Sequence, residues 1–281
     1  MKRRDFLISA AAASAVMLMP PAFAAPTRFT SDRISVVVQG SGPDVILIPG
    51  LTASREMWQG TVAAVAGYRY HLVQVAGFAG APARANARGP VVAPLAEEIA
   101  RYIRSRGLKR PALVGHSMGG TLATMVAARH PEIAGKVMVV DMLPQPAGLV
   151  GSTAAGIGGL ASLLQGLSGT PEGRGLIDSA IRIFGNDGAT NSRSDPDVVA
   201  RVTHELAVTD LTPELRRIAA PLTIVYAAPD PSRGRLEDQR YRIGYSGHRA
   251  PRLVRIDRSG HMIMFDQPAR FREALRSFLA G

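Results

Sequence analysis

The sequence PALVGHSMGGT, residues 111–121, joins a short apolar run to a stretch with the composition and apolar spacing of a helix. The apolar run predicts a buried strand, and residues 122–129 predict the helix. Gly115 and Gly119 stand two positions before and two positions after Ser117, where a chain that reverses so tightly leaves no room for side chains. We therefore predict a strand, a sharp turn and a helix, with Ser117 at the apex of the turn.

This turn places the hydroxyl of Ser117 where a nucleophile could act. The apex residue of such a turn is driven toward positive φ, so its side chain projects clear of the backbone. It also lies at the N-terminus of the following helix, where the dipole and free N–H groups favour an oxyanion. The spacing GxSxG between a strand and a helix is typical of a nucleophile elbow.

Further apolar runs predict the rest of a sheet. The run at 44–48 has no polar face, and the runs that end at 75, 140 and 227 are also strongly apolar, so they predict strands covered on both sides. Residues 253–257 predict the last strand. Helical segments separate most of them, which favours an α/β fold with a mostly parallel twisted sheet and helices on both faces. Residues 33–39 alternate in polarity and predict an edge strand that forms a hairpin with 44–48 through the turn at 41–43.

The alternation stops between residues 144 and 212. This part is rich in Gly, Ala and Leu, contains helical segments near 173–184 and 198–208, and has no convincing buried strand. We predict a helical cap or lid at 144–212, inserted after the sixth strand into a core formed by 25–143 and 213–281.

Residues 1–24 predict a signal peptide rather than a part of the fold. A basic start precedes an apolar run too short for a bilayer span, and small residues suited to signal peptidase precede Ala25. Arg3 and Arg4 resemble the twin-arginine signal of bacterial export, and an ordinary secretory signal is the alternative. We therefore expect a periplasmic or secreted protein with no integral membrane segment in its mature part.

Composition restricts the chemistry. The chain has no cysteine, which excludes disulfides, thiolate metal sites and a cysteine nucleophile. Its net charge is +11, carried mainly by arginines spread along the sequence and densest between Arg233 and Arg258. Because no nucleic-acid motif or interleaved aromatic residue accompanies them, we expect a basic surface and no nucleic-acid partner. No metal or organic cofactor is expected.

The residues just beyond the predicted strand ends supply the partners of Ser117. His261 follows the last strand, and Gly260 lets its loop approach the elbow closely, so His261 is the candidate base. We favour Asp230 as the acid that orients His261, because it follows the preceding strand, lies between two prolines and keeps the chain order Ser, Asp, His. Asp141, at the end of the strand after the elbow, is the alternative acid.

An acyl-transfer site also needs two converging N–H donors for the oxyanion. The backbone N–H of Met118, the residue after the nucleophile, is one candidate. The backbone N–H of Leu51 is the other, because Pro49 and Gly50 turn the chain after a strand expected to neighbour the elbow strand.

With these motifs in place, the mature chain resembles the α/β-hydrolase family over essentially its whole length. The segment ILIPGL resembles the family's oxyanion segment, VGHSMGG its elbow, APLTIVYAAPD its acid-bearing strand and SGHMIMFDQP its histidine loop. Pro49 replaces the usual histidine before Gly50, and the loop sequence at 74–77 also departs from the common pattern. These departures affect the expected pocket shape more than the expected triad.

The resemblance and the candidate residues together predict a hydrolase that cleaves a carboxylic ester, or a related acyl bond, in a small molecule through a Ser117 acyl-enzyme. An acyltransferase or perhydrolase with the same triad, and a ligand-binding relative without catalysis, are the alternatives. The cap contributes a set of aliphatic residues that predicts a nonpolar acyl or alcohol group in the substrate. These are Leu149, Val150, Ile157, Leu160, Leu163 and Leu164.

Overall fold

The computed structural model describes residues 29–150 and 193–281, without the side chains of Leu149 and Val150. The predicted signal peptide, the helix expected near 173–184 and the aliphatic lid residues lie outside the described residues. None of the described helices is both long enough and apolar enough to span a membrane.

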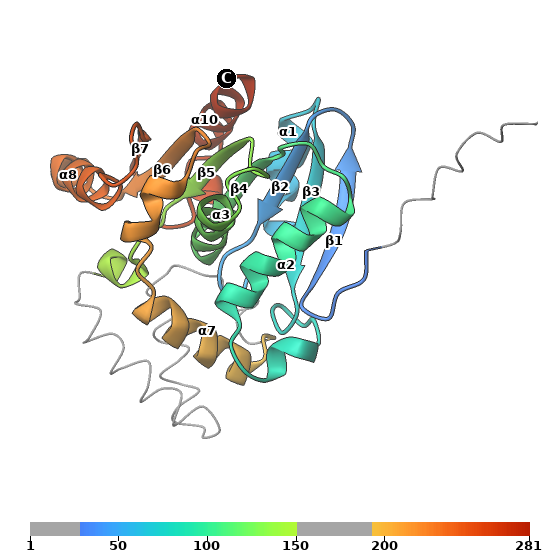
Figure 1. Ribbon diagram of the computed structural model, residues 1–281. Helices are drawn as coiled ribbons and strands as arrows, with labels where there is room; N and C mark the ends of the chain where they lie inside the picture. Colours follow the sequence, from blue (N-terminus) through green and yellow to red (C-terminus); the bar gives the residue numbers. More distant parts are fainter. Residues whose placement is uncertain (1–28, 151–192) are drawn as a thin grey trace, which may run out of the picture.

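The described residues contain a seven-stranded sheet with the strand order β1-β3-β2-β4-β5-β6-β7 (Figure 1). All neighbouring strands are parallel except β1 and β3. This confirms the predicted mostly parallel α/β architecture. In chain order the strands are β1 (Ile34–Gly40), β2 (Asp44–Ile48), β3 (Arg69–Val75), β4 (Ala112–His116), β5 (Lys136–Val140), β6 (Leu222–Ala228) and β7 (Arg252–Asp257).

The predicted hairpin between the first two strands is wrong. β1 pairs antiparallel with β3, from Ile34 opposite Val75 to Gly40 opposite Arg69, and does not pair with β2. β2 has parallel neighbours on both sides, β3 and β4, so its backbone groups are already paired. The more exposed β1 therefore takes the outer edge of β3, and the turn after Gly40 carries the chain past that strand.

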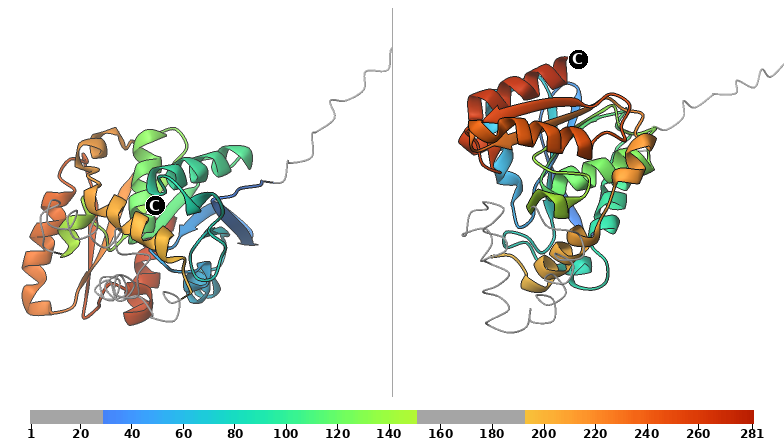
Figure 2. Two further views of the ribbon diagram at one scale, coloured as in Figure 1. Left: turned by 90° about the horizontal axis from the view of Figure 1, so that it is seen from below. Right: turned by 90° about the vertical axis from the view of Figure 1, so that its left-hand side faces the viewer.

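Helices cover both faces of the sheet. The short α1 packs beside α10 on one face, and α2 and α3 pack together on the other (Figure 2). The helices named here are α1 (Gln59–Ala64), α2 (Val92–Ser105), α3 (Met118–Arg129), α7 (Pro196–Val208), α8 (Gly234–Gly244), α9 (Ile263–Asp266) and α10 (Pro268–Ala280). The short 3-10 helices are η1 (Arg55–Trp58), η2 (Arg84–Ala87), η3 (Pro146–Val150), η4 (Thr212–Arg217) and η5 (Pro231–Arg233).

Alternation along the strands builds a separate apolar core on each face. In β2, Ile46 and Ile48 belong to the core beneath α2 and α3, whereas Val45 and Leu47 belong to the core that contains Trp58 and the apolar side of α10. Because both faces of β2 are buried, the strand carries no polar residue between Asp44 and its end. Burial on both faces, which we inferred from the sequence, therefore explains the uniformly apolar pattern of this strand.

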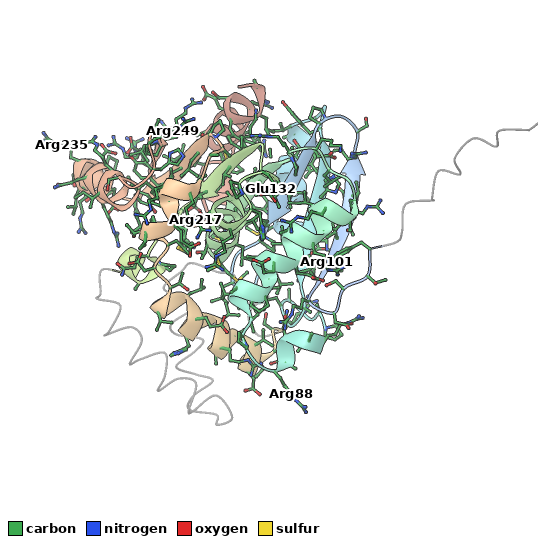
Figure 3. All side chains as sticks on the ribbon, in the orientation of Figure 1. Arg88, Arg101, Glu132, Arg217, Arg235 and Arg249 are labelled. Atoms are coloured by element: carbon green, nitrogen blue, oxygen red, sulfur yellow. The ribbon has the colours of Figure 1, made fainter. Side chains whose placement is uncertain are left out.

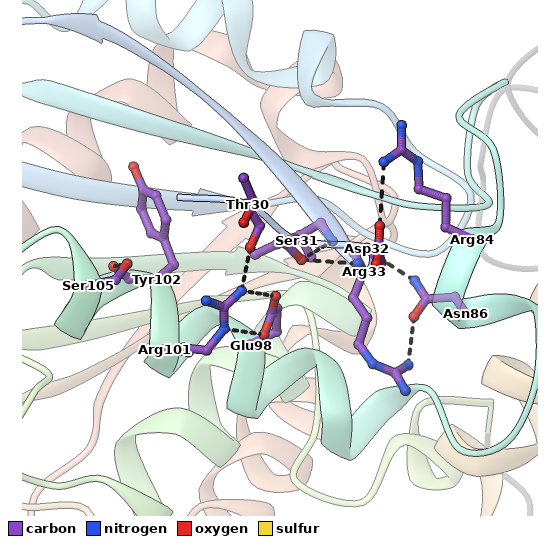
Figure 4. Close-up of polar contacts among 11 residues, drawn as sticks. Thr30, Ser31, Asp32, Arg33, Arg84, Asn86, Glu98, Arg101, Tyr102 and Ser105 are labelled. Carbon is purple, nitrogen blue, oxygen red and sulfur yellow. Dashed lines mark hydrogen bonds and ion pairs between the residues drawn. The ribbon is translucent and has the colours of Figure 1, made fainter. Parts of the chain in front are cut away.

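The start of the described chain is fixed by polar contacts to α2 and η2 (Figure 4). The Arg101 guanidinium donates to the backbone carbonyl of Thr30 at 2.7 Å and pairs with Glu98 at 2.6 Å. The Arg33 guanidinium donates to the side-chain oxygen of Asn86 at 2.8 Å. These contacts hold the residues before β1 against the helical layer.

The predicted insertion begins after β5, the fifth strand in both chain and sheet order, rather than after the sixth. Of its residues, the structure describes η3 at the beginning and α7 at the end. α7 lies beyond the carboxyl ends of the parallel strands (Figure 1). The boundaries 144–212 and the lid role stay predictions.

α7 is fastened to the core by charged side chains one helical turn apart. The Glu205 carboxylate accepts hydrogen bonds from the backbone N–H groups of Val91 and Val92 at the start of α2, at 2.9 and 2.7 Å. Arg201, four residues earlier, donates to the carbonyl of Ala87 at 2.8 Å. A carboxylate satisfies the free N–H groups of a helix start, and a guanidinium satisfies carbonyls left by a short helix. These contacts hold α7 against the start of α2 and the end of η2.

Candidate active site

The elbow forms as its sequence predicts. Ser117 connects β4 to α3 with φ 53°, in the positive-φ region that non-glycine residues rarely adopt. A Cβ atom on Gly115 would lie 2.0 Å from the carbonyl oxygen of Gly119, and one on Gly119 would lie 2.3 Å from the carbonyl oxygen of Ile48. Both glycines are therefore required by the close approach of backbone segments. At Gly119, the start of α3 lies directly against the end of β2.

Strand register places Ser117 beside Asp141. β4 and β5 are parallel neighbours, and His116 at the end of β4 is paired with Val140 at the end of β5. The next residue of each strand is Ser117 and Asp141, and the Ser117 N–H donates to the Val140 carbonyl at 2.9 Å. Two adjacent strands therefore deliver a hydroxyl and a carboxylate to the same point of the sheet edge.

The structure pairs His261 with Asp141. The Nδ1 atom of His261 lies 2.7 Å from Oδ2 of Asp141, which is buried, and the His261 side chain is 10% exposed. His261 reaches this position from the loop between β7 and α9. Its ring also lies against the ring of His116, the residue that precedes Ser117, with 4.6 Å between ring centroids. The base candidate therefore contacts both the acid and the elbow.

The other oxygen of Asp141 is held by two donors. The backbone N–H of Ala227 and the hydroxyl of Tyr241 each donate to Oδ1 at 2.9 Å. Burial raises the pKa of the Asp141 carboxyl, but the hydrogen bonds from His261, Ala227 and Tyr241, with the attraction of the His261 ring, outweigh it and lower the pKa below 3.8. The carboxylate is thus ionised and fixed in orientation at neutral pH.

Asp230, the preferred acid of the sequence analysis, takes no part in this arrangement. It lies in the turn after β6, is exposed, and its Oδ1 accepts a hydrogen bond from the Ser232 N–H at 2.8 Å. That contact caps η5. Our preference for Asp230 over Asp141 is therefore wrong as regards the partner of His261, because the chain has already left the sheet edge two residues after β6 ends.

One sequence signal could have favoured Asp141. It follows the last strand residue directly, whereas Asp230 stands two residues beyond β6 and precedes a proline. A residue immediately after a buried strand stays at the sheet edge, and an Asp-Pro pair favours a turn with an Asx-type contact. Asp257, within a few residues of His261, ends β7 and pairs with Arg255.

The two predicted oxyanion donors lie on neighbouring backbone segments. Met118 is the first residue of α3, so its N–H points out of the helix end. Leu51 follows the end of β2, whose Ile48 is paired with Gly115 of the elbow strand. Both residues are buried. Their placement is consistent with an oxyanion hole, and that role stays a proposal.

The lowered pKa of Asp141 gives a testable dependence of stability on pH. A carboxyl whose folded-state pKa lies below its unfolded value stabilises the fold above the unfolded pKa, and this contribution is lost as pH falls through the folded pKa. We expect the urea midpoint of the wild type to exceed that of Asp141→Asn by a constant amount from pH 7 to about pH 5, and the gap to narrow below about pH 4. Urea titrations at each pH measure the gap, and a gap that widened on acidification would contradict this assignment.

The labelled arginines of the described part lie apart from one another. Arg88, Arg101, Arg217, Arg235 and Arg249 come from different segments of the chain (Figure 3). Within 29–150 and 193–281, no three His, Asp or Glu side chains gather as metal ligands.

Comparison with known sequences identifies the family. The model of the alpha/beta hydrolase family matches residues 45–274, which include the elbow, Asp141 and His261. The chain belongs to the alpha/beta hydrolase family. The chain is 34% identical over 116 residues to a pimeloyl-[acyl-carrier protein] methyl ester esterase of Vibrio atlanticus, a match that covers 41% of this chain and 42% of the relative. The same-named esterase of Aeromonas hydrophila is 34% identical over 112 residues, 40% of this chain and 42% of the relative.

The match thus spans about two fifths of these curated relatives. Solved structures are similar over more of the chain. An esterase from Exiguobacterium antarcticum superimposes with a TM-score of 0.72 at 21% identity, over 88% of this chain and 96% of that chain. An enol-lactonase from Burkholderia xenovorans gives 0.63 at 19% identity, over 88% and 96%. At these identities the likeness shows the shared fold.

Proposed function

We propose that this hydrolase cleaves a carboxylic ester through an acyl-enzyme on Ser117. The observation that carries the proposal is the hydrogen-bonded pair of His261 and Asp141, which lies at the same sheet edge as the elbow and contacts His116, the residue before Ser117. A serine hydroxyl is a weak nucleophile until a neighbouring base accepts its proton. The arrangement supplies such a base and a fixed carboxylate to orient it.

The chemistry follows from these positions. Asp141 accepts the Nδ1–H of His261, which leaves Nε2 as the lone-pair acceptor for the Ser117 proton. The alkoxide attacks the ester carbonyl, and we propose that the N–H groups of Met118 and Leu51 stabilise the oxyanion. His261 then gives the proton to the leaving alcohol, and later activates water, which releases the acid and regenerates Ser117.

The family relatives support an ester as the bond that is broken. The two curated relatives described above carry esterase names, and the bond in their printed substrate is a methyl ester. We propose that the substrate of this chain carries a nonpolar acyl or alcohol group, on the strength of the aliphatic residues of the insertion.

A series of p-nitrophenyl esters from acetate to dodecanoate tests the activity and its preference. We expect hydrolysis to rise from acetate to a longer acyl group, and a fluorophosphonate probe to label Ser117 alone, as located by peptide mass spectrometry. Labelling of another residue, or hydrolysis of the whole series at the rate of buffer, would contradict the proposal.

We also propose that the protein is exported. The basic start with Arg3 and Arg4, the short apolar run and the small residues before Ala25 support this. Fractionation of the bacterial cells that produce it tests this proposal, and full-length protein confined to the cytoplasm would contradict it.

A further inference from the structure

His116, a variable position of the elbow pattern, forms a direct link to the loop of the candidate base. Its Nε2 lies 2.9 Å from the backbone carbonyl oxygen of His261. The planes of the two rings are tilted by 49°, with centroids 4.6 Å apart. The residue beside the nucleophile and the candidate base are thus joined both by a hydrogen bond and by ring contact.

The proton positions on His116 follow from its partner. A backbone carbonyl can only accept, so Nε2 carries the proton and donates it, and Nδ1 holds a lone pair. Burial lowers the pKa of His116 to about 3, and the nearby His261 ring acts in the same direction. The ring therefore stays neutral at the pH of an esterase assay, and His116 is a permanent donor to the His261 loop rather than an acid or base.

The other edge of the His116 ring abuts the turn that carries Leu51. Its buried Nδ1 has no hydrogen-bond partner among the described residues. A Cβ atom on Gly50 would lie 2.8 Å from this Nδ1 and 3.3 Å from Cβ of Ser117. Position 50 is therefore kept free of a side chain by the elbow, and the ring fills the space between the turn before Leu51 and the loop of His261.

The rest of the histidine loop is fixed from other directions. The Gly260 N–H donates to the Asp266 carboxylate at 2.7 Å, and the Arg258 N–H donates to the Ala228 carbonyl at 2.8 Å. Those contacts tie the loop to α9 and to the end of β6. The contact from His116 ties it to the elbow strand itself, so it sets the position of the base relative to the nucleophile.

We propose that His116 is a positioning residue for the reaction, which holds the backbone of His261 in register with Ser117 through its Nε2–H. This rests on the proposed ester hydrolysis at Ser117. Because proton transfer from Ser117 requires the base within hydrogen-bond reach, a small displacement of His261 lowers the rate of the chemical step. Substrate binding, which does not involve His116, stays unchanged.

Two substitutions separate the hydrogen bond from the volume of the ring. His116→Leu keeps an apolar side chain of similar bulk but removes the donor, and His116→Gln keeps an N–H donor at a similar reach. We expect kcat for p-nitrophenyl butyrate to fall about 10- to 100-fold in His116→Leu with KM within about twofold, and to recover to within about fivefold of wild type in His116→Gln. Labelling of Ser117 by the fluorophosphonate should slow in parallel with kcat.

His248 supplies a matched control. It is also a buried histidine, but it follows α8 and its Nδ1 accepts a hydrogen bond from the N–H of Ala250. His248→Leu should lower the thermal midpoint without changing kcat in the protein that remains folded. All rates are measured below the midpoint of the least stable variant, so that a general loss of fold does not imitate loss of positioning.

The outcomes distinguish this inference from the proposed function. Wild-type kcat in His116→Leu, or equal kcat losses in His116→Leu and His116→Gln, would overturn the positioning role while hydrolysis dependent on Ser117 stood. Equal hydrolysis by the wild type and Ser117→Ala would instead refute the proposed function. If His116→Leu does not fold, His116→Gln alone tests the inference. A kcat reduced more than about tenfold at an unchanged thermal midpoint would overturn the inference, and a kcat near that of the wild type would support it.

Discussion

Ser117→Ala is expected to lower kcat for p-nitrophenyl ester hydrolysis about a million-fold, to a residual rate set by binding and the oxyanion donors. Alanine removes the one hydroxyl that the elbow presents beside His261 and Asp141, so no acyl-enzyme can form. The backbone can keep its shape, because Gly115 and Gly119, which allow the turn, are unchanged. Rates are measured with wild type and variant purified in parallel, together with the thermal midpoint of each.

The fluorophosphonate probe provides the control for this prediction. It should label the wild type at Ser117 and fail to label Ser117→Ala. A variant that is folded and retains more than about a hundredth of wild-type kcat would contradict the role of Ser117, since that exceeds what residual stabilisation leaves once a triad member is removed.

Asp141→Asn is expected to lower kcat about 10,000-fold while the protein keeps its fold. The Ala227 N–H and the Tyr241 hydroxyl both donate to Oδ1, so the amide oxygen of asparagine is held on that side. Its NH2 group then faces His261 and donates to Nδ1. The histidine is forced into the tautomer with the proton on Nε2, which cannot accept the proton of Ser117.

Asp230→Asn is the matched control for this substitution. The same chemical change is made at an exposed carboxylate, and an asparagine oxygen can still accept the hydrogen bond from the Ser232 N–H. We expect kcat within about twofold of wild type, because nothing at the site contacts this residue. The kinetics of the two variants, measured side by side, decide between the two carboxylates. A large loss of kcat in Asp230→Asn with little loss of kcat in Asp141→Asn would instead favour Asp230 as the acid.

The elbow was predictable because its determinants are local. Gly115, Ser117 and Gly119 lie within five residues, and the apolar run before them and the helical spacing after them are read directly from the sequence. Burial of β2 was predictable for the same reason. Its uniformly apolar residues indicate burial on both faces, whichever strands lie beside it. His261 could also be predicted as a candidate from the sequence, because it follows the last predicted strand and Gly260 precedes it.

The choice between Asp141 and Asp230 was not local. Both follow buried strands, both precede His261 in the chain, and both satisfy the order Ser, Asp, His. Which carboxylate meets the base depends on how far each lies beyond its strand and on the donors that Ala227 and Tyr241 bring from other elements. The first of these can be read from the sequence, but the donors come from segments far apart in the chain, and no local pattern encodes their position.

The sequence by itself determined most of the strands and helices, the mostly parallel sheet and the tight turn at Ser117, because short-range sterics and burial on both faces constrain the types of neighbouring residues. Only the tertiary structure decided that β1 pairs with β3, that Asp141 holds His261, and that His116 binds the carbonyl of the histidine loop. Each of these depends on strand register and on which loops meet at one sheet edge. These contacts are set by the packing of the whole domain. The sequence pattern therefore places no constraint on His116, and its role becomes visible only when the His261 carbonyl lies beside it.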